Sequence, residues 1–167
     1  AGCDEDGDLV LAPDEPHAFT RFVHAVPDTS GMDWRFIDQI ENSPEWFNLT
    51  FRQFTPYRAT TPGERHLRIF PKSTDINVTQ QHLIDTVLTL AEDTYYTIVH
   101  VGHSRAGAAS PDHILLIEDP IPTISATEVA IRALHLATGQ PTVDVFQTAT
   151  TTGTLPACPT FSGVGLE

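Results

Sequence analysis

FTRFVHAVPDTSGMDWRF, residues 19–36, is the stretch that decides the fold, because the chain repeats its polar framework as VAIRALHLATGQPTVDVF at residues 129–146. Each copy has an arginine, a histidine three residues later and an aspartate nine residues after that: Arg21, His24 and Asp33, then Arg132, His135 and Asp144. Every matched position is displaced by 111 residues. A displacement of this size is domain-sized and exceeds the roughly 20–50-residue periods of solenoid repeats.

Each copy predicts two β-strands joined by a tight, proline-containing turn, because apolar residues surround the arginine and histidine and a second β-like run begins near the aspartate. Adjacent strands would let Arg21 pair with Asp33, and Arg132 with Asp144, as structural ion pairs. For His24 and His135 the pattern predicts buried rings hydrogen-bonded to the backbone or to a loop residue. A metal-ligand role is the alternative.

The residues of the first copy also carry a family resemblance. Arg-x-x-His-Ala-x-Pro-Asp, followed by a short loop, an aspartate and an aromatic-rich strand, resembles the start of the domain-of-unknown-function 4397 repeats, as do Tyr57 before Pro62-Gly63 and the strand at 95–99. The match covers about residues 19–149, although Met32-Asp33-Trp34-Arg35 replaces the usual V-D-V-Y. The resemblance implies an immunoglobulin-like β-sandwich, often in secreted or membrane-anchored bacterial proteins, with no established chemistry.

Length and local patterns predict one all-β domain, an immunoglobulin-like antiparallel β-sandwich with short irregular N- and C-terminal extensions. A chain of 167 residues suffices for one well-packed core but not for two sandwiches of about 100 residues each. We expect an acidic tether at 1–17, the sandwich with a partial second copy (129–149) at 18–149, and a Thr/Pro/Gly tail at 150–167.

The strands expected between the two copies are short runs bounded by proline, glycine and polar residues. They are residues 47–51, 67–70, the later half of 79–91, 94–101 and 114–117. The segment 79–91 also fits one face of a helix, but its context favours a strand. Ser43-Pro44-Glu45 predicts a single helical turn at about 42–46.

The charge of the chain excludes one class of partner. The 9 Lys and Arg residues face 22 Asp and Glu residues, a net charge of −13, whereas nucleic-acid binding needs a basic surface. No run approaches the roughly 18 apolar residues that cross a bilayer, so membrane attachment would need another device.

Cys3 is the candidate for that device. Ala1-Gly2-Cys3 is similar to the end of a bacterial lipobox, and an acidic segment follows it as a tether would. We therefore expect lipidation of Cys3 and a location on the extracytoplasmic, periplasmic side of a bacterial membrane. The alternatives are a disulfide between Cys3 and Cys158 or two free thiols.

The best candidate for catalysis is Ser104, within GHSRAG at residues 102–107 after a predicted strand. A serine on a strand-to-helix elbow is the nucleophile of α/β-hydrolases, but Ala106 stands at the second glycine position and Pro111 interrupts any following helix. The pattern favours a loop between antiparallel strands. Eight histidines include no metal-binding spacing, so the sequence predicts no catalytic residue, cofactor or metal.

Two segments are candidate interfaces. Residues 52–72 carry a local charge of +4 and interleaved aromatic residues, a composition typical of protein interfaces; the basic residues are Arg52, Arg58, Arg65, Arg68 and Lys72. The alternative is a solvated sheet face whose cations balance nearby carboxylates. Leu9, Val10 and Leu11 form an apolar patch inside the acidic tether.

Together these features predict a non-catalytic, lipid-anchored accessory or structural subunit that binds and stabilises a larger membrane protein complex. One alternative is a small secreted hydrolase using Ser104. Another is a carbohydrate- or surface-binding module with Trp34, Trp46 and Tyr57 as aromatic platforms.

Overall fold

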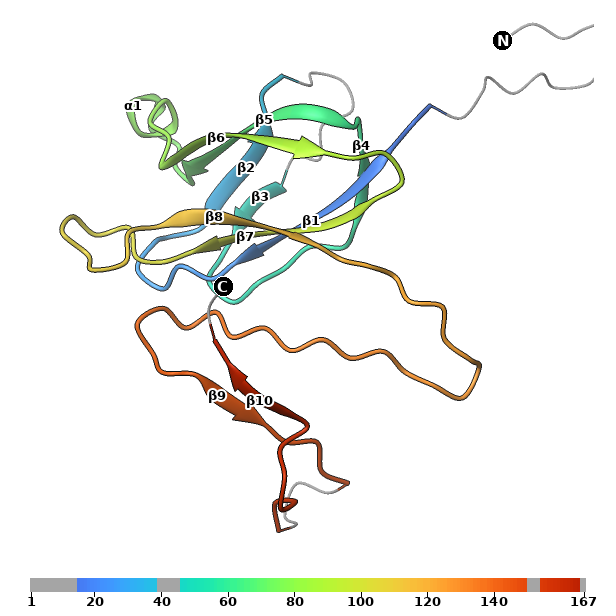
Figure 1. Ribbon diagram of the computed structural model, residues 1–167. Helices are drawn as coiled ribbons and strands as arrows, with labels where there is room; N and C mark the ends of the chain where they lie inside the picture. The colour runs from blue at the N-terminus through green and yellow to red at the C-terminus, as the bar shows by residue number, and fades with distance from the viewer. Residues whose placement is uncertain (1–14, 39–45, 150–153, 166–167) are drawn as a thin grey trace, which may run out of the picture.

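Two four-stranded β-sheets pack face to face in this protein (Figure 1). The computed structural model describes residues 15–38, 46–149 and 154–165. A single helical turn, α1 (Ile76–Thr79), connects two strands of one sheet. None of the described helical residues forms a segment long and apolar enough to cross a membrane. The all-β, immunoglobulin-like sandwich predicted from the sequence is confirmed.

The first sheet has the strand order β4-β1-β7-β8. Its strands are β1 (Ala18–His24), β4 (Arg58–Thr60), β7 (Tyr95–Val101) and β8 (His113–Glu118). β1 pairs with β4 and β7 with β8 in antiparallel fashion, but β1 and β7 run parallel, with Phe19 opposite Tyr95 and His24 opposite His100. This parallel pair brings the first strand of the chain to the middle of the sheet.

The second sheet has the strand order β3-β2-β5-β6 and is antiparallel throughout. Its strands are β2 (Met32–Phe36), β3 (Trp46–Leu49), β5 (Gly63–Pro71) and β6 (Ile84–Leu90). The β5 and β6 strands pair along their length, from Gly63 opposite Leu90 to Ile69 opposite Ile84. Within 79–91, the strand preferred over a helix is therefore confirmed for residues 84–90.

β1 and β2 do not lie side by side, because the chain passes from one sheet to the other between them. The predicted ion pair between Arg21 and Asp33 is therefore wrong. Arg21 donates a hydrogen bond to Thr97 on β7, and Asp33 accepts one from the backbone of Asn48. The prediction failed because two strands paired in a hairpin and two strands that cross between sheets have the same sequence pattern, an apolar strand, a turn and a second apolar strand.

The core lies between the sheets and is built by alternation along each strand. In β1 every second residue is buried, and Phe22 packs against Trp34 at 4.9 Å between ring centroids. Burying side chains of this size stabilises the fold by about 1.5–3 kcal/mol each. Trp34 is fully buried, so its predicted role as a carbohydrate platform is wrong.

The second copy of the repeat lies outside the sandwich. Its aspartate lies in β9 (Val143–Val145), which among the described strands pairs with β10 (Phe161–Val164) alone, and Figure 1 shows this ribbon beneath the two sheets. The first strand predicted for that copy, around Arg132 and His135, is not formed, because residues 129–137 contain no strand. That prediction was wrong because the segment lacks neighbours like β4 and β7, which hydrogen-bond to β1. The helical turn predicted at 42–46 falls almost wholly outside the described residues.

Candidate functional site

Asp28, in the Pro-Asp pair of the first repeat, ties two loops together. Its carboxylate accepts hydrogen bonds from the backbone N–H of Ser104 at 2.9 Å and of Arg105 at 3.3 Å, and Arg105 adds an ion pair at 3.1 Å. The bond from the Ser104 backbone is the main cause that lowers the pKa of Asp28. The β1–β2 loop and the β7–β8 loop are therefore held to each other at one end of the sandwich.

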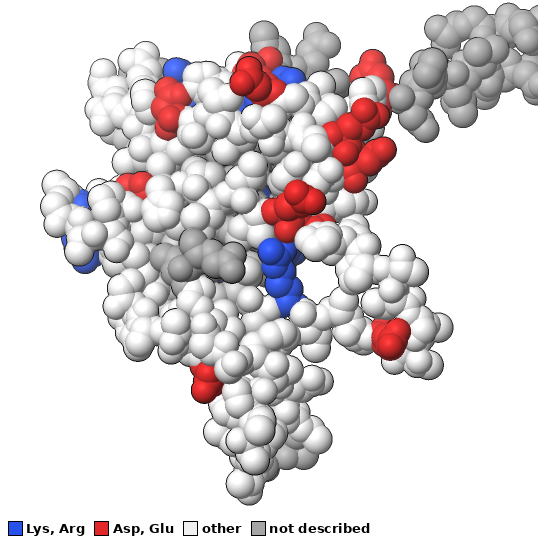
Figure 2. Space-filling model, in the orientation of Figure 1, with Lys and Arg blue, Asp and Glu red and all other residues white. Residues whose placement is uncertain are grey.

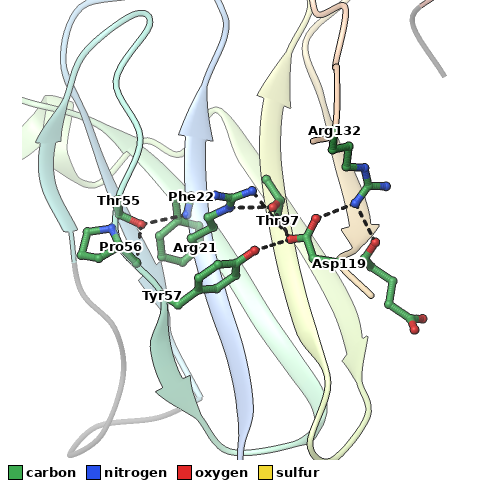
Figure 3. A network of polar contacts seen from close by, with 9 residues as sticks. Arg21, Phe22, Thr55, Pro56, Tyr57, Thr97, Asp119 and Arg132 are labelled. Carbon is green, nitrogen blue, oxygen red and sulfur yellow. Dashed lines mark hydrogen bonds and ion pairs between the residues drawn. The ribbon is translucent and has the colours of Figure 1, made fainter. Parts of the chain in front are cut away.

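Asp119, which follows β8, is the centre of a polar network on the first sheet (Figure 3). Tyr57 donates a hydrogen bond to its carboxylate at 2.6 Å, and the hydroxyl of Thr97 donates another. Arg21 donates to Thr97 at 2.8 Å and stacks over the Tyr57 ring at 4.7 Å. Burial first, and then the bond to Asp119, raise the pKa of Tyr57.

The two arginines of the repeat converge on this one carboxylate. Arg132 pairs with one oxygen of Asp119 at 2.6 Å, and the Arg21 guanidinium lies 4.0 Å from the other. Arg132 also donates to the backbone carbonyl of Glu118 at 2.9 Å. The predicted pair between Arg132 and Asp144 is therefore wrong, because Asp144 accepts a bond from the Gly163 backbone within the β9–β10 ribbon.

His24 and His100 stack on each other inside the sandwich, with ring centroids 5.3 Å apart and planes 8° from parallel. Trp34 meets both rings edge-on. His24 shares a hydrogen bond with Thr29 at 2.9 Å, and His100 shares one with Asp112 at 2.9 Å. The prediction of a buried His24 bonded to a loop residue is confirmed.

Both buried imidazoles are kept neutral. Burial, with repulsion from His100, lowers the pKa of His24 from 6.5 to about 4. Burial also lowers the pKa of His100, although Asp112 opposes the shift. Neither ring is therefore ready to accept a proton near neutral pH, which disfavours a general-base role for this pair. His135, the repeat partner of His24, is half-buried and bonds to the backbone carbonyl of Pro141 at 3.1 Å.

A pocket of about 440 Å³ opens at the same end of the sandwich. Its walls come from the β1–β2, β3–β4 and β7–β8 loops and from the turn that follows His135. Phe51 and Arg52 contribute from the β3–β4 loop, His103 from the β7–β8 loop and Leu136 from the second copy. The sandwich and the second copy meet at this pocket, and they also meet at a hollow of about 660 Å³ between β8 and residues 132–136.

The outer face of the second sheet presents an aromatic ring between two cations. Phe47 on the edge strand β3 is 54% exposed, with the Arg35 guanidinium 5.4 Å and the Lys72 ammonium 5.8 Å from its ring. Together with Asp33 and Phe70 they line a hollow of about 350 Å³. This exposed combination of arginine, lysine and phenylalanine is typical of protein interfaces.

The structure does not gather the basic residues of 52–72 into one patch. Arg65 and Arg68 lie on β5 and Lys72 directly follows it, each beside an aspartate: Arg65 with Asp38 at 2.9 Å, Arg68 with Asp85 at 2.8 Å and Lys72 with Asp33 at 3.8 Å. Arg58 lies on β4 and stacks over the Trp46 ring, while Arg52 lies in the β3–β4 loop. The paired residues fit the alternative of a balanced sheet face.

The aromatic platforms other than Trp34 are also covered. Arg58 lies 4.2 Å from the Trp46 ring centroid, and Arg21 lies over Tyr57. A sugar that stacked on the same face of either ring would have to displace the arginine. Nothing in their geometry favours a carbohydrate platform.

Ser104 lies in the loop between the antiparallel strands β7 and β8, with no helix after it. The preceding Gly102 has φ of +109°, and a Cβ there would lie 2.5 Å from the Pro111 carbonyl oxygen, so only glycine fits. The loop between antiparallel strands that Ala106 and Pro111 predicted is therefore observed. A strand-to-helix elbow like that of hydrolases is not found among the described residues.

Some candidate residues lie outside the described part of the chain, namely Cys3, Leu9, Val10 and Leu11. Cys158 is exposed and forms no disulfide with a described residue. Within the described ranges, no three His, Cys, Asp or Glu side chains come together as metal ligands would.

Sequence reasoning missed the acceptors at the centre of the site. Asp28 stood in the repeat motif, but no role followed from it until the β7–β8 loop was placed beside it. Asp119 precedes Pro120 at the end of a predicted strand, which marks it as a loop residue and gives no sign of its four partners. For Arg35 and Phe47 the sequence predicted strands but gave no sign that the two side chains would lie together.

Comparison with known proteins agrees with this architecture. Residues 18–146 match the model of the family described as Domain of unknown function (DUF4397). No curated protein matches the chain. The matched range contains both copies of the repeat and all eight strands of the sandwich, so the chain belongs to the DUF4397 family.

Proposed function

We propose that this protein is a non-catalytic accessory subunit, held by a lipid on Cys3 at the extracytoplasmic face of a bacterial membrane, that binds a larger membrane protein complex. The observation that carries the proposal is the exposed Phe47 between Arg35 and Lys72 on the outer face of the second sheet. A large apolar ring left in solvent between two cations is a feature of surfaces that bind other proteins.

Charge complementarity supports a partner surface with acidic side chains around an apolar pocket. The Arg35 side chain has no carboxylate partner among the described residues, whereas Lys72 pairs with Asp33 at 3.8 Å. Arg35 is therefore a cation in excess at this hollow, in a chain of net charge −13. Opposite charge on the partner would speed association and select its orientation.

The lipid anchor supplies the second part of the proposal. A domain tethered to the bilayer has a high effective concentration beside a membrane partner, so a small contact surface is sufficient. Hydrophobic attachment of this kind is stable when two or more acyl chains are present. The segment between Cys3 and β1 would then provide the reach to the partner.

The test compares two charge reversals of equal size. Arg35→Glu changes the proposed surface, whereas Arg58→Glu changes an arginine that also stacks on an aromatic ring but lies on β4 of the other sheet. We expect R35E to reduce co-purification of partner polypeptides from gently solubilised membranes by roughly ten-fold. R58E should leave it near the wild-type level. Equal losses in both variants, or a wild-type protein that migrates as a free monomer, would overturn the proposal.

Anchoring is tested separately with Cys3→Ser. We expect the wild-type protein to fractionate with membranes and the variant to move to the soluble fraction, since the acyl chains supply the attachment. The exposed Cys158 provides the control, because Cys158→Ser should stay with the membranes. An intact mass without acyl chains on Cys3 would contradict the anchor. The Phe47 surface, formed by Arg35, Phe47 and Lys72, would still be tested by R35E.

A further inference from the structure

We propose that the 440 Å³ pocket at the loop end of the sandwich binds a small organic anion, a carboxylate attached to an apolar or aromatic body. The site is separate from the Phe47 surface, which lies on the outer face of the other sheet, and its use does not depend on a protein partner. A volume of this size falls within the roughly 300–1,000 Å³ range of small-molecule sites.

Arg52 is the first reason for choosing an anion. Each of the other arginines has either an aspartate or an aromatic ring beside its guanidinium: Arg21, Arg65, Arg68, Arg105 and Arg132 have an aspartate, and Arg35 and Arg58 have a ring. Among the described residues Arg52 has neither, although it lines a pocket. An arginine without a partner presents its fork of N–H donors to a ligand carboxylate.

The backbone holds Arg52 in a conformation that non-glycine residues rarely adopt, with φ of +71°. Its N–H donates to the carbonyl of His24 at 2.8 Å, and the N–H of His24 donates to the carbonyl of Gln53 at 3.0 Å. Backbone strain of this kind costs about 1–3 kcal/mol and tends to cluster at binding sites. The β3–β4 loop is thereby attached to the end of β1, and the backbone of Arg52 is held in place at the pocket.

The charge of the lining is the second reason. Among the described residues no aspartate or glutamate lines this pocket, whose lining residues of titratable type are Arg52, His24 and His103. His103 is fixed by two backbone bonds, one from its N–H to Ser110 and one to its carbonyl from Asp112. On the face shown in Figure 2, acidic side chains gather over the sandwich, whereas residues 121–165 carry only Glu128, Arg132 and Asp144.

The remaining walls indicate the rest of the ligand. Pro27, Phe51 and Leu136 supply apolar surface, which favours an apolar body attached to the carboxylate. One lining residue, Thr138, also has a buried hydroxyl without a hydrogen-bond partner among the described residues. Buried polar groups of this kind are costly to leave unpaired.

The experiment uses three probes with one aromatic body and different charges: phenylacetate, 2-phenylethanol and 2-phenylethylamine. Binding to the full-length protein is measured by titration in two-dimensional NMR spectra. We expect phenylacetate to shift the amide signals of Phe51, Arg52 and His103, and to bind at least about ten-fold more tightly than the alcohol or the amine. Tighter binding of the amine, shifts confined to other residues, or no binding of any probe would overturn the proposal.

The matched variants are Arg52→Asn and Arg58→Gln. Asparagine tolerates the left-handed backbone conformation better than most residues, so R52N removes the guanidinium with little change of the loop. We expect R52N to weaken phenylacetate binding about ten-fold or more, and R58Q, which removes an arginine outside the pocket, to leave it unchanged. Unaltered amide dispersion confirms folding of both variants. Wild-type affinity in folded R52N would contradict the role of Arg52.

Discussion

The two copies of the repeat have the same polar residues at the same spacings, yet only the first lies in a sandwich. Ala18, Phe22 and His24 of β1 are fully buried between β4, β7 and the facing sheet. The matching segment of the second copy has no strand partner, and its Val129 and Ile131 are 81% and 56% exposed. The repeat motif therefore does not make its own strand.

The difference shows what the motif needs from its surroundings. Backbone donors and acceptors in β1 are paired on both sides, and the side chains that alternate inward meet a second sheet. In the second copy, Arg132 reaches Asp119 of the first sandwich, whereas the apolar side chains remain largely exposed. The polar residues of the second copy find hydrogen-bond partners without a core, so such contacts are not enough to make a buried strand.

The largest expected contrast is at the core position after each aspartate, Trp34 in the first copy and Val145 in the second. Trp34→Ala would leave a large cavity between the sheets and should lower the free energy of unfolding by about 3–5 kcal/mol. Val145→Ala, in the half-buried ribbon strand, should lower it by less than about 1 kcal/mol. Urea denaturation followed by circular dichroism measures both, and comparable losses would show that the ribbon belongs to the same cooperative core.

The next contrast concerns the pH dependence of stability and compares His24 of the first copy with His135 of the second. The pKa of His24 is lowered from 6.5 to about 4 in the folded chain. Below pH 6.5 the unfolded chain therefore binds a proton at His24, whereas the folded chain binds it only as the pH approaches 4. Its contribution to stability is complete above pH 6.5 and is lost as the pH falls toward 4, an effect of up to about 3 kcal/mol. The lowered pKa of Asp28 acts only below this window.

His24→Gln should therefore make the decline of the free energy of unfolding between pH 6.5 and pH 4 shallower, while the part that comes from His100, whose pKa burial also lowers, remains. His135→Gln, which alters a half-buried ring bonded to one carbonyl, should keep the wild-type slope. Denaturant titrations at several pH values measure both slopes. An unchanged slope in folded H24Q would mean that His24 is not held neutral by burial.

The smallest contrast compares two aspartates, Asp119 in the network and Asp144 in the ribbon. Asp119→Ala leaves Tyr57, Thr97 and Arg132 without their shared acceptor and should cost about 2 kcal/mol. Asp144 is exposed and accepts one backbone bond, so Asp144→Ala should stay within about 0.5 kcal/mol. Both losses are again measured by denaturation. Equal losses would show that the bond of Asp144 in the ribbon stabilises the fold as much as the Asp119 network does.

The strands of the sandwich could be predicted because their signals are local. β-Branched and aromatic residues in 95–101, and alternation in 84–90, predict strands from neighbouring residues alone. The arrangement of those strands depends on pairs far apart in the chain. Nothing within residues 19–36 distinguishes a hairpin from a crossover between sheets, which is why the pairing of Arg21 with Asp33 was predicted wrongly.

The candidate sites were less predictable for the same physical reason. The pocket near Arg52 is assembled from loops whose positions follow only from the packed sheets. The basic segment 52–72 reads as one patch in the sequence, but the turn from β4 to β5 divides it between two sheets. Its charge balance also depends on Asp38 and Asp85, which lie outside the segment.

The parallel pairing of β1 with β7 sets an order of events during synthesis. β1 emerges first, but one of its two neighbours lies 76 residues further on, as the bond between Arg21 and Thr97 shows. Contacts of such long sequence separation form late and slow the folding of β-sandwiches. Until β7 has been made, at least one edge of β1 is open to other extended chains, so the nascent chain is exposed to aggregation throughout that interval.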